Sequence, residues 1–201
     1  HGGIGVLVNN AGYGLWGPVA SLSIRELRAQ FETNLFAAFR LTNIVLPEMV
    51  AKGRGTIVNI SSVEGRLATP FSGGYASTKF ALEGMSEVLR LELWPLGVRV
   101  ALVEPGLFHT NFHKNQVMAE RADSNELPYH SYIKRYRARR GRYDWLAGDP
   151  IKVAKVVHKI ARSRRPRFRY PVGPDARLGM LAARFLPERL FQTLLSRATL
   201  R

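Results

Sequence analysis

The chain has 201 residues, of which 46% are hydrophobic and 22% charged, so it can bury the core of one domain. It contains no cysteine, which excludes disulfides and thiolate metal sites. The sequence has no signal peptide and no apolar run of about 18 residues or more, so it predicts no transmembrane helix.

Positive charge is concentrated in the second part of the chain. Residues 1–120 contain 10 Lys and Arg against 9 Asp and Glu, whereas residues 121–201 contain 20 against 6. A basic region of this kind attracts anionic lipid, nucleic acid or a phosphorylated cofactor. Since no nucleic-acid-binding motif accompanies the charge, we interpret it first as a solvated basic face and expect no nucleic-acid partner.

Short apolar runs alternate with helical patterns along the chain. The apolar runs predict buried strands at residues 4–9, 56–61, 98–103 and 167–172. Periodic segments predict helices at about 23–51, 74–94, from 150 onward, 175–184 and 187–198. Ser23 and Glu26 form a capping box, and Asp149-Pro150 suits an N-cap followed by the first helical residue. The alternation predicts an α/β fold with a parallel sheet between helices.

Small and polar residues follow three of the predicted strands. They are Asn9-Asn10-Ala11-Gly12, Ser61-Ser62 and Pro105-Gly106. Because ligands of such sheets bind at the carboxyl ends of the strands, we expect the functional site there. Residues 107–148 have no clear period and are rich in aromatic side chains.

Tyr75 and Lys79 are four residues apart on a predicted helix and therefore share one face. A free phenol has a pKa of about 10, and a nearby ammonium lowers it, so the pair can act as a general acid–base unit. The pair alone is a common helix-surface feature. Ser62, thirteen residues before Tyr75 at the end of a strand, adds a hydroxyl to the same region.

The order of these motifs resembles the short-chain dehydrogenase/reductase superfamily: N-N-A-G at 9–12, a helix asparagine at 34, Ser62, Y-x-x-x-K at 75–79 and P-G-x-x-x-T at 105–110. The resemblance covers essentially the whole chain. It implies a Rossmann-type doubly wound parallel sheet and an oxidoreductase that transfers hydride with NAD or NADP.

The resemblance also implies roles for individual residues. Tyr75 would exchange a proton with the substrate oxygen, Lys79 would lower the tyrosine pKa and bind the nicotinamide ribose, and Ser62 would hold the substrate oxygen. Asn34 would anchor a water in a proton relay from Lys79, although a lone helix asparagine otherwise indicates a kink or an incidental polar residue.

The cofactor-binding residues implied by the resemblance fall into two groups. Asn10, Ala11 and Gly12 would line the adenosine and ribose part of the cofactor, although a simple turn after the strand explains them equally well. The second group would shape the nicotinamide side: Pro105, Gly106 and Thr110. No metal site is expected, because the histidines, His113 among them, show no suitable spacing with carboxylates.

The tail, residues 169–177 and 185–191, resembles hydroxysteroid- and retinol-dehydrogenase-like members of the superfamily. The implied substrate is a secondary alcohol or ketone on a steroid-, retinoid- or lipid-like skeleton. In this interpretation residues 1–201 form one partial domain, in which 107–148 cover the substrate and 175–198 add C-terminal helices. We expect a cytoplasmic or membrane-peripheral protein that forms a homodimer or homotetramer through helices 24–51 and 74–94.

One family motif has no counterpart here. The fingerprint T-G-x-x-x-G-x-G does not precede the N-N-A-G strand, and Gly2-Gly3-Ile4-Gly5 follows no strand. We therefore expect the sequence to be the C-terminal part of a longer enzyme whose sheet lacks its first strands and helices here, which would leave strand 4–9 as an exposed apolar edge. The alternative is an inactive product that acts as a binding or membrane-peripheral interaction protein through its basic helices.

Overall fold

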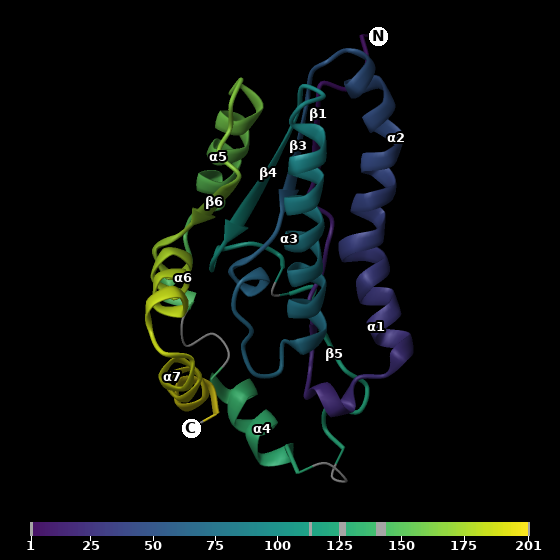
Figure 1. Cartoon of the computed structure of the whole chain (residues 1–201). Helices are drawn as coiled ribbons and strands as arrows, with labels where there is room; N and C mark the ends of the chain where they lie inside the picture. The colour runs from purple at the N-terminus through teal and green to yellow at the C-terminus, as the bar shows by residue number, and fades with distance from the viewer. Residues whose placement is uncertain (1, 113, 125–127, 140–143, 201) are drawn as a thin grey trace.

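The computed structural model describes residues 2–112, 114–124, 128–139 and 144–200. Its main sheet has the strand order β1-β3-β4-β6, and every neighbouring pair is parallel (Figure 1). The strands are β1 (Val6–Asn9), β3 (Gly55–Ile60), β4 (Val98–Pro105) and β6 (Arg169–Val172). The predicted α/β fold with a parallel sheet is confirmed.

Helices cover both faces of this sheet. Ile57 and Val100 pack with residues of α2 (Ala37–Ala51) and α3 (Gly73–Leu93) on one face. Their strand neighbours Val58 and Ala101 pack with Ile160 of α5 (Ile151–Ala161) on the other. Adjacent strand residues point to opposite faces, so the continuous apolar runs of the sequence reflect burial on both sides.

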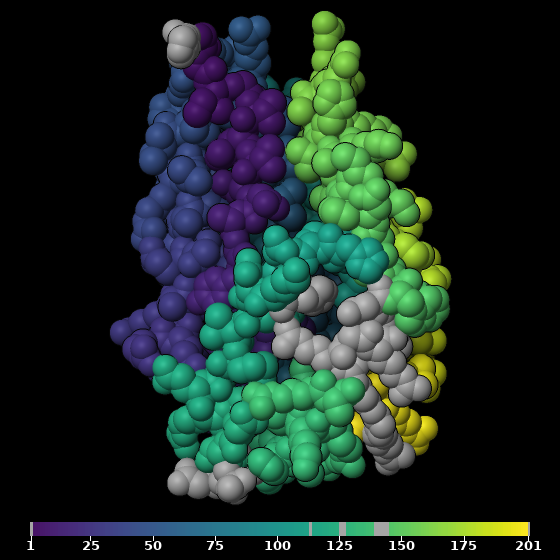
Figure 2. Space-filling model, turned by 180° about the vertical axis from the view of Figure 1, so that it is seen from behind, coloured from purple at the N-terminus to yellow at the C-terminus, as the bar shows by residue number. Residues whose placement is uncertain are grey.

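The edge of the sheet at β1 is partly uncovered. Leu7 packs against the core beneath α2, whereas Val6 and Val8 are 37% and 40% exposed. Figure 2 shows this N-terminal segment, in purple, at the surface of the molecule. The exposed apolar edge expected from the sequence is therefore present in the chain as described.

The first long helix is interrupted. It consists of α1 (Ile24–Phe31), a π-helical turn at Glu32–Phe36, and α2. The predicted capping box is confirmed, because Ser23 Oγ accepts the N–H of Glu26 at 3.2 Å and Glu26 accepts the N–H of Ser23 at 2.8 Å. Helix α5 begins at Ile151, one residue later than predicted, and Asp149 Oδ1 accepts the Ile151 N–H at 2.9 Å.

Residues 107–148 contain elements that the sequence did not predict. Helix α4 (His130–Arg139) lies beside α7 (Glu188–Leu200), and the short strand β5 (Val117–Met118) pairs with β2 (Leu15–Trp16). Helix α4 escapes a periodicity search because Ile133 is its one fully buried side chain among the described residues. The tail forms α6 (Pro174–Phe185) and α7, close to the predicted ranges.

Candidate active site

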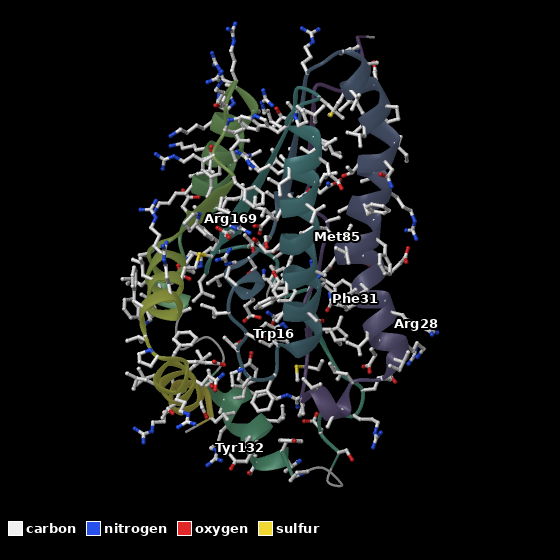
Figure 3. The ribbon with its side chains drawn as sticks, viewed as in Figure 1. Trp16, Arg28, Phe31, Met85, Tyr132 and Arg169 are labelled. Atoms are coloured by element: carbon white, nitrogen blue, oxygen red, sulfur yellow. The ribbon has the colours of Figure 1, made fainter. Side chains whose placement is uncertain are left out.

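Tyr75 lies in the first turn of α3 and is buried, with 6% of its surface exposed. Aromatic rings enclose it: the ring centroid of Trp16 is 6.5 Å away and that of Phe112 is 5.3 Å away. Figure 3 labels Trp16 near the N-terminal end of α3. A Cβ on Gly74 would lie 3.2 Å from the Leu15 side chain, so this end of α3 packs closely against β2. The phenol therefore sits in an apolar, largely dry environment.

Ser62 is the hydroxyl that reaches Tyr75. It follows β3, its hydroxyl lies near enough to Tyr75 to lower the pKa of the phenol, and its Oγ accepts the backbone N–H of Glu64 at 3.1 Å. Ser61 points elsewhere, and its buried Oγ has no hydrogen-bond partner among the described residues. The geometry supports the choice of Ser62 over its neighbour, which the sequence made on spacing alone.

Lys79 lies one helical turn beyond Tyr75 and is also buried. Its Nζ donates a hydrogen bond to the carbonyl of Ile60 at 2.8 Å and lies 5.6 Å from the centroid of the Tyr75 ring. Burial lowers the pKa of the Lys79 ammonium to about 8, while the charge of Glu83 acts in the opposite direction. The structure thus brings together the three side chains that the sequence grouped.

The electrostatics of Tyr75 differ from the prediction. Burial raises the pKa of the phenol above its usual value, the charge of Glu64 raises it further, and the hydrogen bond with Ser62 lowers it. The net shift is therefore upward, opposite to the predicted lowering, and a contribution of Lys79 in favour of the phenolate stays a prediction. The physical reason is that loss of solvent around the phenolate outweighs the groups that favour it.

Asn34 lies in the π-helical turn, and its side chain is fully engaged. Its Oδ1 accepts the Tyr13 N–H at 3.0 Å, and its Nδ2 donates to the Tyr13 carbonyl at 2.9 Å and to Thr78 Oγ1 at 3.1 Å. These bonds tie the loop after β1 to α3 and do not reach Lys79. The irregular helix expected for a helix asparagine is present, whereas the proton relay stays a prediction.

Asn10, Ala11 and Gly12 are exposed just beyond the end of β1. Their backbone can approach a ligand, although a Cβ on Gly12 would lie only 3.1 Å from Asn34 Oδ1. The glycine is therefore needed for packing within the protein, whatever else it does. This residue supports both interpretations that the sequence left open.

Pro105 is the last residue of β4, and Gly106 and Thr110 follow it at the same end of the sheet. Thr110 is exposed, and its Oγ1 accepts the Phe112 N–H at 3.2 Å. At Gly106, a Cβ would lie 2.1 Å from Asp175 Oδ2. The same oxygen accepts the Leu107 N–H at 2.7 Å, so Asp175 of α6 fixes the turn after β4.

The ends of β1 and β4 offer groups that fit the ribose and carboxamide parts of a nicotinamide dinucleotide. Exposed backbone at Asn10–Gly12 and the Thr110 hydroxyl suit a ribose and a carboxamide, and Lys79 adds a buried ammonium nearby. The printed sequence contains no T-G-x-x-x-G-x-G motif for the pyrophosphate. The residues present therefore fit the two nucleoside parts of the cofactor, with Asn10–Gly12 on the adenosine side and Thr110 on the nicotinamide side.

Three functional or supporting residues were missed in the sequence. Glu64, Asp175 and Asn9 are buried or half-buried polar groups; the partners of Asp175 and Asn9 lie far along the chain, whereas Glu64 bonds the nearby Thr69. Asn9 Nδ2 donates to Asn59 Oδ1 at 2.8 Å, and Asn59 in turn donates to Ser86 at 2.8 Å, which links β1, β3 and α3. The position of Asn9 in N-N-A-G was a usable signal, whereas nothing in the sequence announced the partners of Glu64 and Asp175.

Metal ligation has no candidate in the part of the chain that the structure describes. There, no group of three His, Asp or Glu side chains could hold an ion. His113 lies outside the described residues.

Comparison with known proteins identifies the family to which the chain belongs. A family model described as short chain dehydrogenase matches residues 1–121. The chain belongs to the short-chain dehydrogenase family. Members of this family are NAD(P)-dependent oxidoreductases, so the predicted enzyme class and the Rossmann-type fold are confirmed.

Two relatives of this short-chain dehydrogenase have names that refer to different substrates. The 3-ketodihydrosphingosine reductase of Bacteroides thetaiotaomicron is 34% identical over 193 residues, which cover 96% of this chain and 71% of that protein. Retinol dehydrogenase 8 of Bos taurus is 38% identical over 175 residues, which cover 84% of this chain and 55% of that protein.

Solved structures agree with the fold. A short-chain dehydrogenase from Streptomyces avermitilis superposes with a TM-score of 0.79 at 34% identity, over 98% of this chain and 69% of that one. A metagenomic short-chain oxidoreductase in complex with NADP gives a TM-score of 0.61 at 29% identity, over 86% of this chain and 63% of that one.

Proposed function

We propose that the protein containing this chain interconverts a secondary alcohol and a ketone on an apolar substrate, with Tyr75 as the acid–base residue. One observation carries the proposal: the phenol of Tyr75 is buried, with the Lys79 ammonium 5.6 Å from its ring centroid and the Ser62 hydroxyl near enough to lower its pKa. A phenol, a hydroxyl and an ammonium that converge in a water-poor pocket can transfer a proton and stabilise an oxyanion.

Each side chain has a distinct role in the proposed reaction. In reduction, Tyr75 donates its proton to the substrate carbonyl oxygen as that oxygen gains charge. Ser62 donates a hydrogen bond to the same oxygen, and the Lys79 ammonium stabilises the phenolate that remains. In oxidation, the phenolate accepts the proton of the alcohol. When bound, NAD or NADP supplies or accepts the hydride.

Cofactor contacts follow from the positions of the exposed strand ends. Asn10, Ala11 and Gly12 are proposed to contact the ribose and adenosine part. On the other side of the site, Pro105, Gly106 and Thr110 would contact the nicotinamide. The NADP complex of a 29% identical oxidoreductase supports a dinucleotide as the cofactor.

An apolar substrate is supported by the rings around Tyr75. Besides Phe112, Tyr136 lies 6.0 Å from Trp16 and 5.3 Å from Phe71 between ring centroids. Phe112 and Tyr136 belong to residues 107–148, which we propose cover the substrate. Two relatives carry the names of 3-ketodihydrosphingosine and of retinol, which are consistent with a lipid-like skeleton.

The experiment that tests the proposal compares Tyr75→Phe with the unchanged protein on long-chain ketones, retinoids and steroids, with NADH and NADPH. The expected result is a loss of about 10²–10⁴-fold in kcat/KM with nearly unchanged cofactor affinity, because the phenyl ring keeps the packing and loses the proton. Tyr132→Phe is the matched control, since this tyrosine is exposed on α4 (Figure 3). Turnover retained by Tyr75→Phe would refute the role of Tyr75.

A homodimer is proposed through the outer surface of α2 and α3. Exposed apolar side chains gather there, and a hollow of about 410 Å³ between the helices is lined by Phe39, Met85 and Val88. Figure 3 labels Met85. The molecular mass in solution, measured by light scattering, tests this proposal: a monomer at micromolar concentration would contradict it.

Peripheral contact with anionic membranes is a second candidate function, favoured by the surfaces of α6 and α7. Leu178, Leu181 and Phe185 are exposed on α6, and arginines lie beside them on the same helices. Such a mixture suits the boundary of an anionic bilayer. None of the described helices is long and apolar enough to cross a membrane.

Vesicle co-sedimentation tests the membrane proposal. We expect binding to vesicles that contain phosphatidylserine, loss of binding at high salt, and weaker binding by Phe185→Asp. Val19→Asp is the control, because this exposed apolar residue lies outside the basic tail. Equal binding to vesicles of phosphatidylcholine alone, or none at low salt, would contradict the proposal.

A further inference from the structure

The carboxyl group of Glu64 is buried close to the proposed catalytic residues. Glu64 is 9% exposed and lies in the 3₁₀ turn η3 (Val63–Gly65), directly after Ser62. Thr69 Oγ1 donates a hydrogen bond to Oε1 at 2.7 Å, and the Ser72 hydroxyl is bonded to Thr69 in turn. Oε2 is buried and has no partner among the described residues. A buried carboxyl oxygen without a partner is costly, which suggests a functional role.

The surrounding geometry joins Glu64 to Tyr75. Turn η3 packs along α3, and Ser72 is the N-cap residue of that helix. Ser62 connects the two residues, because its Oγ accepts the Glu64 N–H at 3.1 Å and its hydroxyl also lowers the pKa of Tyr75. The Glu64 charge is consequently placed at the end of α3 where the phenol lies, within a region of low solvent access where charges interact strongly.

We propose that Glu64 is a positioning residue for Tyr75, whose carboxylate disfavours the phenolate and so sets the pH range in which Tyr75 acts as a base. The inference rests on the proposed function of Tyr75. It concerns a residue that no motif of the family match includes. When Glu64 carries its charge, Tyr75 keeps its proton to higher pH. When Glu64 is neutral, the phenolate forms at lower pH.

The ionisation of Glu64 falls within the working range of most enzymes. Burial raises the pKa of Glu64 to about 7, against the hydrogen bonds of Ser72 and Thr69, which lower it. The charge of Glu64 in turn raises the pKa of Tyr75.

Other charged groups face η3 from the elements packed against it. Arg66 follows directly on the same segment. Glu64 forms no ion pair with any of these groups among the described residues, so its charge is not neutralised locally. The groups on neighbouring elements are Lys79 and Glu83 of α3, Glu104 of β4, and Asp175 and Arg177 of α6.

Glu64→Gln tests the inference because the glutamine side chain keeps the shape and the hydrogen-bonding capacity of Glu64 but carries no charge. In alcohol oxidation, the rise of kcat/KM with pH reports the formation of the phenolate. We expect this rise to move to lower pH by about half a unit to one unit in Glu64→Gln. Glu188→Gln, an exposed carboxylate on α7, should leave the profile in place. An unmoved profile in a folded Glu64→Gln protein would overturn the inference.

A second readout does not depend on turnover. The ultraviolet absorbance of tyrosinate during a pH titration, with the signal of Tyr75→Phe subtracted, isolates the ionisation of Tyr75. Glu64→Gln should lower the pH of this transition, and Glu64→Asp, which keeps the charge, should not lower it. The Asp variant also serves if the Gln variant does not fold.

The two failures are distinguishable. Turnover that survives Tyr75→Phe contradicts the proposed function itself. Loss of turnover in Tyr75→Phe, combined with an unmoved tyrosinate transition in Glu64→Gln, contradicts only the inference about Glu64.

Discussion

The two faces of helix α3 reverse the usual distribution of side chains. Its buried face contains polar and ionisable residues, Tyr75, Lys79 and Glu83 at successive turns, whereas its exposed face contains Phe80, Val88 and Leu91. A globular helix normally buries its apolar stripe. The proposed chemistry would account for the buried polar face, and the proposed dimer contact for the exposed apolar face. Each face therefore indicates a function that packing alone would not require.

Beyond Lys79, the polar face continues into a network around Arg169 of β6. Its Nε lies 3.1 Å from Glu83 Oε2 and 3.6 Å from Glu104 Oε1, and its side chain also bonds Glu87 at 2.9 Å. Figure 3 labels Arg169 beside the sheet. Burial and the charge of Glu83 raise the pKa of Glu104 to about 7. One arginine thus compensates two buried carboxylates at the end of the Tyr75–Lys79–Glu83 row.

The largest expected effect comes from Lys79→Met on the polar face. Removal of the ammonium deprives the phenolate of its nearest positive charge, so we expect kcat/KM to fall by about 10²-fold or more. The melting temperature should change little, because a buried charge is replaced by an apolar chain of similar length. Lys155→Met on the exposed side of α5 is the control. Equal kcat/KM in wild type and Lys79→Met would contradict a role of Lys79 in the proposed mechanism.

Arg169→Met tests whether the ion pairs of Arg169 stabilise the packing of the polar face of α3. The substitution leaves Glu83 and Glu104 without their partner, and we expect a loss of about 2–4 kcal/mol in the free energy of unfolding, less than for a fully buried pair because Arg169 is partly exposed. Urea unfolding near pH 7 measures it. The exposed neighbour Arg167→Met should cost much less. If both variants cost the same, the ion network contributes nothing specific.

Val88→Glu combined with Leu91→Glu addresses the exposed face. These side chains are 54% and 71% exposed, so the monomer should fold normally while the proposed dimer dissociates through unpaired charges in an apolar contact. Light scattering gives the mass, and circular dichroism confirms the fold. Leu178→Glu on α6 is the control for an exposed leucine elsewhere. A dimer that persists in the double variant would place the contact on another surface.

The smallest expected effect is a pH-dependent stability change in Glu64→Gln. The pKa of Glu64 rises from 4.5 to about 7 on folding, so the folded state binds more protons between these values. Stability therefore falls as pH rises through this window, and the penalty is complete above about pH 7. Glu64→Gln should gain about 1–3 kcal/mol relative to wild type at pH 8 and little at pH 4. A constant difference across this range would contradict the raised pKa.

The sequence predicted the parallel sheet, the long helices and the trio of Tyr75, Lys79 and Ser62, because short-range spacing and strand ends determine them. It did not predict that Glu64 raises the pKa of Tyr75 or that Asp175 fills the space beside Gly106. These effects depend on contacts between distant segments and on burial, which spacing does not encode. The sequence did not predict helix α4, because a single buried isoleucine among many charged residues gives no apolar period.

A double-substitution cycle tests most directly whether Tyr75 and Ser62 act on one substrate oxygen. Tyr75→Phe, Ser62→Ala and the double variant are compared with wild type by kcat/KM for ketone reduction. If the two hydroxyls act as a unit, the double variant should lose little more activity than Tyr75→Phe alone. If the two losses instead multiply, the residues act independently and the proposed shared site is wrong.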